Sequence, residues 1–146
     1  NLNTTKLSEI SFTEIVESIS RAIDDFKPQE IFLPHLGDVH TDHEIVHKAV
    51  ISSSKTFRKP FIKKLIAYET ISETDFGLEK VFSPNLYIDI SNFIEEKLNI
   101  LKIYESELSD FPFPRSIEAV KALAKVRGAT SGFQAAEAFE ILKCIE

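Results

Sequence analysis

Residues 31–47 read Ile-Phe-Leu-Pro-His-Leu-Gly-Asp-Val-His-Thr-Asp-His-Glu-Ile-Val-His, and the rest of the chain is organised around them. The opening apolar run predicts a short β-strand that ends at Pro34. Thr41 resembles a helix N-cap, and Glu44 three residues later completes a capping box. This strand-to-helix junction holds every histidine of the protein, namely His35, His40, His43 and His47. Imidazole is a common metal ligand and proton carrier, so the junction is a candidate site.

The flanking segments alternate between helical and strand patterns. In chain order they predict helix 11–26 opened by a Ser11–Glu14 capping box, strand 31–33, a helix from Thr41 to the serine run 52–54, strands 64–68 and 86–90, a long helix capped by Ser91, and helices 116–126 and 133–143 after a proline-rich break at 111–114. This order favours an α/β fold with a layered sheet flanked by helices. Three strands are few for so many helices, so we expect N-terminal strands to be missing.

Composition narrows the class of protein. The chain has 146 residues, which suits a single domain, and is 43% hydrophobic and 27% charged, as ordinary globular proteins are. The formal net charge of -6 argues against nucleic acid or an anionic membrane as the main partner. We see no apolar run long enough to span a membrane and no signal-peptide pattern. The single cysteine, Cys144, excludes an internal disulfide and a cysteine-rich zinc module, and it favours a cytoplasmic location.

The sequence contains no methionine and begins Asn-Leu-Asn. A complete translated reading frame starts with methionine, although removal of the initiator residue would also explain the first position. We therefore expect residues 1–146 to form one domain and not to be the whole gene product.

His40 and His43 have the spacing and setting of metal ligands. The positive end of the predicted helix keeps a nearby imidazole neutral, and zinc binds neutral imidazole. Asp42 lies between them and is placed to orient a ring through its second nitrogen, whereas His47, one turn beyond His43, is placed to share a metal. A His-x-x-His pair alone is a weak motif, and it does not supply a full coordination shell. His35 and His47 fit turn-capping and surface positions better than metal ligation.

The stretch from Pro34 to His43 resembles the second signature of the PIG-L/LmbE-like zinc-dependent deacetylases, which remove an N-acetyl group from glucosamine-containing substrates. Shorter similarities follow in order along nearly the whole chain. They are Phe26-Lys27-Pro28, Tyr68-Glu69, Thr74-Asp75-Phe76, Lys97 with Tyr104-Glu105-Ser106-Glu107, Pro114-Arg115-Ser116, Arg127-Gly128 and Ala136-Glu137-Ala138-Phe139.

The resemblance implies a Rossmann-like fold and a zinc-activated water that attacks an acetamide carbonyl. It implies that His43 binds zinc, that a protonated His40 stabilises the oxyanion, and that Asp42 supports His40. The family's other signature, Ala-His-Pro-Asp-Asp-Glu, supplies two zinc ligands and the general base, and this sequence lacks it. Asp24 and Asp25 do not replace it, since they fit a solvated helix face. In the family that signature lies upstream of the region matched here, so the resemblance implies that residues 1–146 are the C-terminal portion of such a deacetylase. We therefore expect the remaining zinc ligands to come from a segment absent here, and this chain alone to be inactive.

The substrate is less well defined by the sequence. Arg115 is a candidate for binding a phosphate or carboxylate of the substrate, but it also fits a surface arginine. Tyr68 and Glu69 fit either a sugar pocket or a sheet edge. The expected partner is a small amino sugar, without nucleic acid or a membrane span, and a homo-oligomer is compatible with the sequence. The alternatives are a non-catalytic sugar- or partner-binding module and an amidase that acts on a thiol conjugate.

Overall fold

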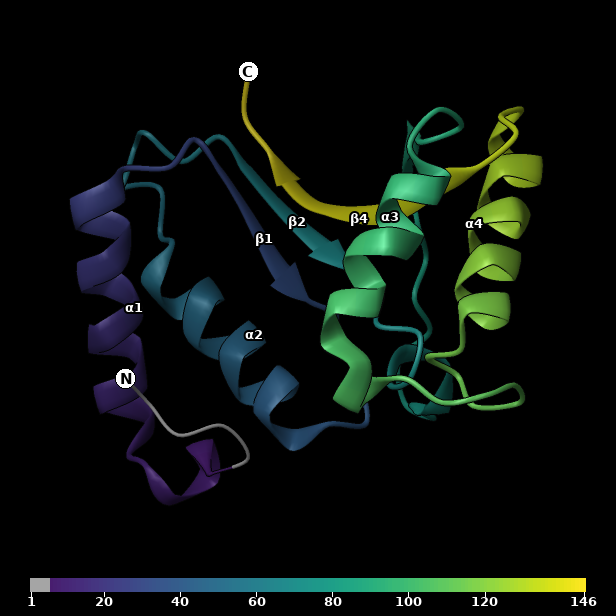
Figure 1. Cartoon of the computed structure of the whole chain (residues 1–146). Coiled ribbons are helices and arrows are strands. Elements are labelled where there is room, and N and C mark those ends of the chain that lie inside the picture. The colour runs from purple at the N-terminus through teal and green to yellow at the C-terminus, as the bar shows by residue number, and fades with distance from the viewer. Residues whose placement is uncertain (1–5) are drawn as a thin grey trace. The chain divides into compact units, whose positions relative to one another are not determined.

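The computed structural model describes residues 6–146 (Figure 1). Its helices and strands are, in chain order, α1 Phe12–Phe26, β1 Glu30–Pro34, α2 Thr41–Ser53, β2 Lys64–Tyr68, β3 Leu86–Asp89, α3 Ile94–Leu101, α4 Ile117–Ser131 and β4 Ala136–Cys144, with short 3₁₀ helices η1 Leu7–Glu9, η2 Thr74–Phe76 and η3 Lys102–Glu107. Within these residues the strands form one mixed sheet in the order β1-β2-β4-β3. β1 and β2 run parallel, whereas β3 and β4 run antiparallel. The predicted α/β fold with a sheet flanked by helices is confirmed.

The chain divides into two compact units. The first runs to Ser83 and also contains Glu140–Glu146, and the second is Pro84–Phe139. The boundary falls within β4, so the start of this strand pairs with β3 in the second unit. The end of β4 belongs to the first unit, where the N–H of Ile145 donates to the Lys63 carbonyl at 2.9 Å.

The first unit is built on α1, α2 and the β1–β2 pair. The Oγ of Ser11 accepts the N–H of Glu14 at 3.2 Å, as the predicted capping box requires, and α1 ends at Lys27 in the left-handed conformation. α1 packs on α2, and α2 packs on β1. The buried core of this unit contains Leu7, Ile15, Ile23, Leu33, Ala49, Val50, Ile62 and Leu65. Burying a side chain such as Leu33 or Ile62 stabilises the fold by about 1.5–3 kcal/mol.

The second unit contains β3, α3 and α4. The Oγ of Ser116 accepts the N–H of Ala119 at 3.0 Å and caps α4, which ends at Gly132 with a φ of 83°. Its small core consists of Ile90, Ala124 and Ala135, with Ile94 packed against them.

The predicted helix 133–143 is wrong, because these residues contain the strand β4. Ala136 and Ala138 are both buried, and the two-residue spacing between them is that of a strand face. Residues 136–139 pair with residues 86–89 of β3, about fifty positions earlier in the chain. A local helical pattern carries no information about this long-range partner, and strand pairing decides the conformation.

The predicted cap of the long helix at Ser91 is also wrong. Ser91 donates its N–H to Oδ1 of Asp89 at 2.9 Å, which forms a turn directly after β3. The helix α3 begins at Ile94, with Phe93 as its N-cap.

Gly128 lies in the middle of α4 for a packing reason. A Cβ atom there would lie 2.7 Å from the Phe133 carbonyl oxygen and 2.9 Å from the backbone of Ala135. Helix propensity alone would make Gly128→Ala stabilising by about 1 kcal/mol. We expect the steric clash to dominate, because backbone atoms must move, and to lower the free energy of unfolding by about 1–3 kcal/mol. Urea unfolding measures this change.

Ala122→Gly at an exposed position of the same helix is the matched control, because it measures the propensity difference without the contact. A Gly128→Ala protein more stable than the unmodified protein would contradict the packing account.

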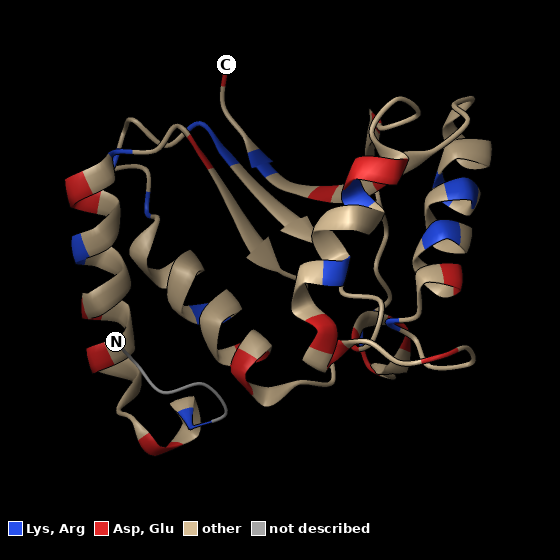
Figure 2. Cartoon of the chain, in the orientation of Figure 1, with Lys and Arg blue, Asp and Glu red and all other residues tan. Residues whose placement is uncertain are grey.

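Basic and acidic residues are interspersed along the helices, strands and loops of the described chain (Figure 2). Acidic residues occupy the first turns of the four α-helices of residues 6–146, with Glu14 in α1, Asp42 and Glu44 in α2, Glu95 and Glu96 in α3, and Glu118 in α4. A negative charge at the N-terminal end of a helix is favourable to the helix dipole. Among residues 6–146, no helix is both long and apolar enough to cross a membrane.

Candidate functional site

The histidine stretch lies at the carboxyl ends of two parallel strands. β1 and β2 pair in register from Glu30 with Lys64 to Pro34 with Tyr68. The segments that follow them, residues 35–40 and 69–77, therefore start from the same edge of the sheet. In open α/β sheets this edge is where ligands bind.

The two segments also contact one another directly. The N–H of Val39 donates to the Glu73 carbonyl at 3.3 Å. A Cβ atom on Gly77 would lie 1.8 Å from the Gly37 carbonyl oxygen, so only glycine allows the two backbones to approach this closely. The segment after β2 is therefore fixed against the histidine stretch by backbone contacts.

His43 is held by a buried carboxylate. Its Nδ1 lies 2.7 Å from Oδ2 of Asp38, whose side chain is 0% exposed, whereas the His43 side chain is 26% exposed. An ionised carboxylate only accepts hydrogen bonds, so the Nδ1–H of His43 donates to it. Nε2 then carries a lone pair, which is the form of imidazole that binds a metal. Sequence reasoning assigned no role to Asp38, although it lies in the same stretch.

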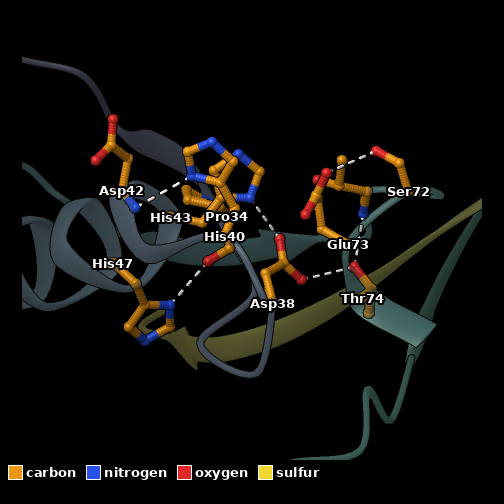
Figure 3. A network of polar contacts seen from close by, with 10 residues as sticks. Pro34, Asp38, His40, Asp42, His43, His47, Ser72, Glu73 and Thr74 are labelled. Atoms are coloured by element: carbon orange, nitrogen blue, oxygen red, sulfur yellow. Dashed lines mark hydrogen bonds and ion pairs between the residues drawn. The ribbon is translucent and has the colours of Figure 1, made fainter. Parts of the chain in front are cut away.

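His40 is the N-cap of α2, whereas we predicted that Thr41 would be. The Nδ1 of His40 accepts the backbone N–H of Asp42 at 3.2 Å, and Thr41 is the first helical residue (Figure 3). Glu44 does not complete a capping box but pairs with Lys48. This contact uses the lone pair of Nδ1, so the ring N–H of His40 is on Nε2 in this arrangement. The His40 and His43 rings stack with centroids 5.0 Å apart.

The other two histidines are buried, not the surface residues that the sequence predicted. His35 is 5% exposed, with Nδ1 at 3.5 Å from Oε2 of Glu140 and Nε2 at 3.3 Å from the Lys80 carbonyl oxygen. His47 is 7% exposed, and its Nδ1–H donates to the Pro34 carbonyl at 2.8 Å. His47 thus connects α2 to the end of β1, which is a structural role.

His47 should make the stability of the fold sensitive to pH. Burial lowers the pKa of its ring, and the hydrogen bond to the Pro34 carbonyl only partly opposes this shift. The unfolded chain regains the ordinary pKa of about 6.5 and therefore binds more protons than the folded state below that pH. The stability due to neutral His47 is complete above about pH 6.5 and is lost as the pH falls toward the lowered pKa.

We expect His47→Asn to reduce the dependence of folding stability on pH. Asparagine keeps an N–H donor for the Pro34 carbonyl, but its side chain does not titrate. Unfolding temperatures at about pH 7.5 and pH 5.5 measure it. An unchanged difference between the two temperatures in the variant would contradict the assignment.

The remaining predicted residues occupy different surroundings. Asp42 is buried, and its backbone N–H donates a hydrogen bond to His40. The Asp42 carboxylate points away from the rings of His40 and His43 (Figure 3). Burial and the charge of Asp38 raise the pKa of the Tyr68 hydroxyl. Arg115 lies in the second unit, where its Nε–H donates to the Glu107 carbonyl at 2.9 Å. Asp24 pairs with Lys59 on the surface of α1.

The described residues do not form a complete metal site. Among residues 6–146, no group of three or more His, Cys, Asp or Glu side chains is placed to hold a metal ion. Beside Asp38 lies a hollow of about 470 Å³, with Glu44, Lys48 and Lys80 among its lining residues. The site therefore combines one imidazole with a lone pair on Nε2 and one imidazole with an N–H there. Neither ring lines the hollow, which adjoins the site through Asp38 and Glu44.

The fold is similar to those of several solved structures. The conserved protein TT1542 of Thermus thermophilus matches with a TM-score of 0.71 and 21% identity over 91% of this chain and 60% of its own. The N,N'-diacetylchitobiose deacetylase of Pyrococcus horikoshii, in complex with its inhibitor MPG, matches with a TM-score of 0.70 and 18% identity. The match covers 92% of this chain and 54% of the deacetylase chain. The zinc-inhibited form of teicoplanin deacetylase Orf2 matches with a TM-score of 0.62 and 14% identity. The match covers 100% of this chain and 57% of the Orf2 chain.

These matches confirm, at the level of the fold, the predicted resemblance to LmbE-like deacetylases. The chain spans between 54% and 60% of the length of the three structures. No protein-family model matches the chain.

Proposed function

We propose that this chain is part of a zinc-dependent N-deacetylase that removes the N-acetyl group of an amino sugar. One observation carries the proposal: two neighbouring histidines use Nδ1 in opposite ways, one facing a buried carboxylate and the other facing a backbone N–H, which assigns them opposite tautomers. The Nδ1–H of His43 donates a hydrogen bond to Asp38, whereas Nδ1 of His40 accepts a hydrogen bond from the backbone N–H of Asp42. One ring is thus prepared to bind a cation and the other to donate a hydrogen bond.

His43 is the residue that would hold the metal. Its Nδ1 contact with a buried carboxylate has the form of the outer-shell partner that orients zinc-binding imidazoles. When bound, zinc would lower the pKa of a coordinated water and polarise the acetamide carbonyl. The described residues provide one such ligand and not a complete shell, so the proposal places the other ligands in the rest of a longer protein.

His40 would stabilise the negative charge that develops on the carbonyl oxygen. Its Nε2–H is the donor that remains after Nδ1 caps α2, and the cap fixes the ring at the helix N-terminus. A donor fixed before the reaction needs no reorganisation, and such groups contribute strongly to amide hydrolysis. Asp42 supports His40 in this proposal, through the backbone N–H that accounts for the ring's tautomer.

The hollow beside Asp38 would receive the sugar. Its lining carries the charged groups of Glu44, Lys48 and Lys80, and sugar hydroxyls can both donate to carboxylates and accept from ammonium groups. Two of the similar structures are named as deacetylases, one of N,N'-diacetylchitobiose and one of teicoplanin. The proposal keeps Arg115 as a substrate-binding residue of the second unit.

The experiment is an acetate-release assay with the full-length protein and a panel of N-acetylglucosamine derivatives. We expect acetate release that stops when a chelator removes zinc and returns when zinc is added. Zinc bound at one equivalent without acetate from any member of the panel would contradict deacetylation.

A second candidate is a non-catalytic sugar-binding module, favoured by the lack of a three-ligand metal group within residues 6–146. Calorimetry with the same panel distinguishes the two, because a binding module would take up sugar without zinc and without releasing acetate.

A further inference from the structure

A directed chain of hydrogen bonds connects the segment after β2 to His43. The backbone N–H of Thr70 donates to Oγ1 of Thr74 at 2.7 Å, and the Thr74 hydroxyl donates to Oδ1 of Asp38 at 2.7 Å. The other oxygen of Asp38 lies 2.7 Å from Nδ1 of His43 (Figure 3). Thr74 is 5% exposed and the Asp38 side chain is fully buried, so water does not readily substitute for either partner.

The backbone N–H of Thr70 fixes the direction of this series of hydrogen bonds. A backbone N–H can only donate, so it occupies a lone pair of the Thr74 hydroxyl and leaves the hydroxyl proton to point at Asp38. Asp38 then accepts at Oδ1 and presents Oδ2 to His43. Only a donor suits that position, which requires the proton of His43 to be on Nδ1.

We propose that Thr74 is a positioning residue that acts through Asp38 to hold His43 in the tautomer with a bare Nε2, ready for a divalent cation. Without the Thr74 hydroxyl, Asp38 keeps one hydrogen bond and is free to rotate about its Cβ–Cγ bond. The Nδ1-protonated form of His43 then loses the fixed acceptor that selects it. The proposal rests on the proposed function, since it takes His43 as the zinc ligand.

The Thr74 hydroxyl can be removed by substitution without separating the two segments. The Val39–Glu73 backbone bond and the Gly37–Gly77 contact hold the two segments together without the side chain of Thr74. Thr74→Val keeps the shape and removes the donor, whereas Thr74→Ser keeps the donor and serves as the matched control. Asp38→Asn is a second variant, because its amide group can turn an N–H toward His43 and favour the wrong tautomer.

The test uses the full-length protein with ¹⁵N-labelled histidine. Ring nitrogen spectra of the metal-free protein at about pH 8, where an ordinary histidine is neutral, report the tautomer of His43. We expect Nδ1–H in the unmodified protein and in Thr74→Ser, and a growing share of Nε2–H in Thr74→Val and Asp38→Asn. Zinc affinity should fall about 10–100-fold in the last two variants and remain within a few-fold in Thr74→Ser.

Nε2–H in the unmodified protein would overturn the proposal even if no variant folded. So would a folded Thr74→Val protein with an unchanged tautomer and unchanged zinc affinity. If His43→Ala left zinc binding intact, the proposed function would fail, whereas the tautomer measurement on metal-free protein would still stand by itself.

Discussion

Replacing His43 by alanine in the full-length protein should abolish zinc retention and, with it, acetate release. The side chain is 26% exposed, and buried Asp38 keeps its hydrogen bond from Thr74, so the fold should survive the loss of His43. Removal of an outer-shell partner already lowers metal affinity about 10–100-fold, and removal of a ligand itself should exceed the upper end of that range. Metal analysis after dialysis, together with the acetate assay, measures both effects.

Ile51→Ala is a suitable control, since it shortens an exposed side chain of the same helix that does not line the hollow. Zinc should remain bound in that variant. Unchanged zinc content in His43→Ala would show that another residue binds the metal.

Replacing His40 by serine should separate catalysis from metal binding. Serine is a good N-cap, so α2 keeps an acceptor for its free N–H groups and little stability is lost. Its side chain lacks the Nε2–H, and loss of one donor to a developing oxyanion lowers kcat by about 10²–10³-fold. Zinc content should be that of the unmodified protein.

His40→Ala completes the comparison, because it removes the cap as well as the donor. We expect the same low turnover as in His40→Ser, with an additional loss of about 0.5–2 kcal/mol in unfolding free energy. Turnover at the level of the unmodified protein in His40→Ser would refute the oxyanion role, and loss of zinc would reassign His40 as a ligand.

The elements specified by local signals could be predicted from the sequence. The Ser11 cap sets the start of α1, and the apolar run of β1 leads into the histidine stretch, as the structure shows. β4 could not be predicted, because the conformation of residues 136–139 depends on pairing with β3. The start of α2 was misplaced by one residue because histidine is an uncommon cap, and its ring nitrogen substitutes here for a hydroxyl oxygen.

The location of the histidines could be predicted from the sequence, but the residues that hydrogen-bond and orient His43 could not. Asp38 and Thr74 are 36 positions apart, and no periodicity connects them. They meet because β1 and β2 are parallel neighbours, so that both segments start from one edge of the sheet. Polar residues shortly after two parallel strands were the available signal, and it becomes usable only when the pairing of the strands is known.

Zinc-edge anomalous diffraction from crystals of the full-length protein grown with zinc is the most direct measurement. The account predicts a peak about 2.0–2.1 Å from Nε2 of His43, with Nδ1 still on Asp38. A zinc peak beside Nδ1 of His43, or zinc bound elsewhere with the His43–Asp38 pair turned away from it, would contradict the account.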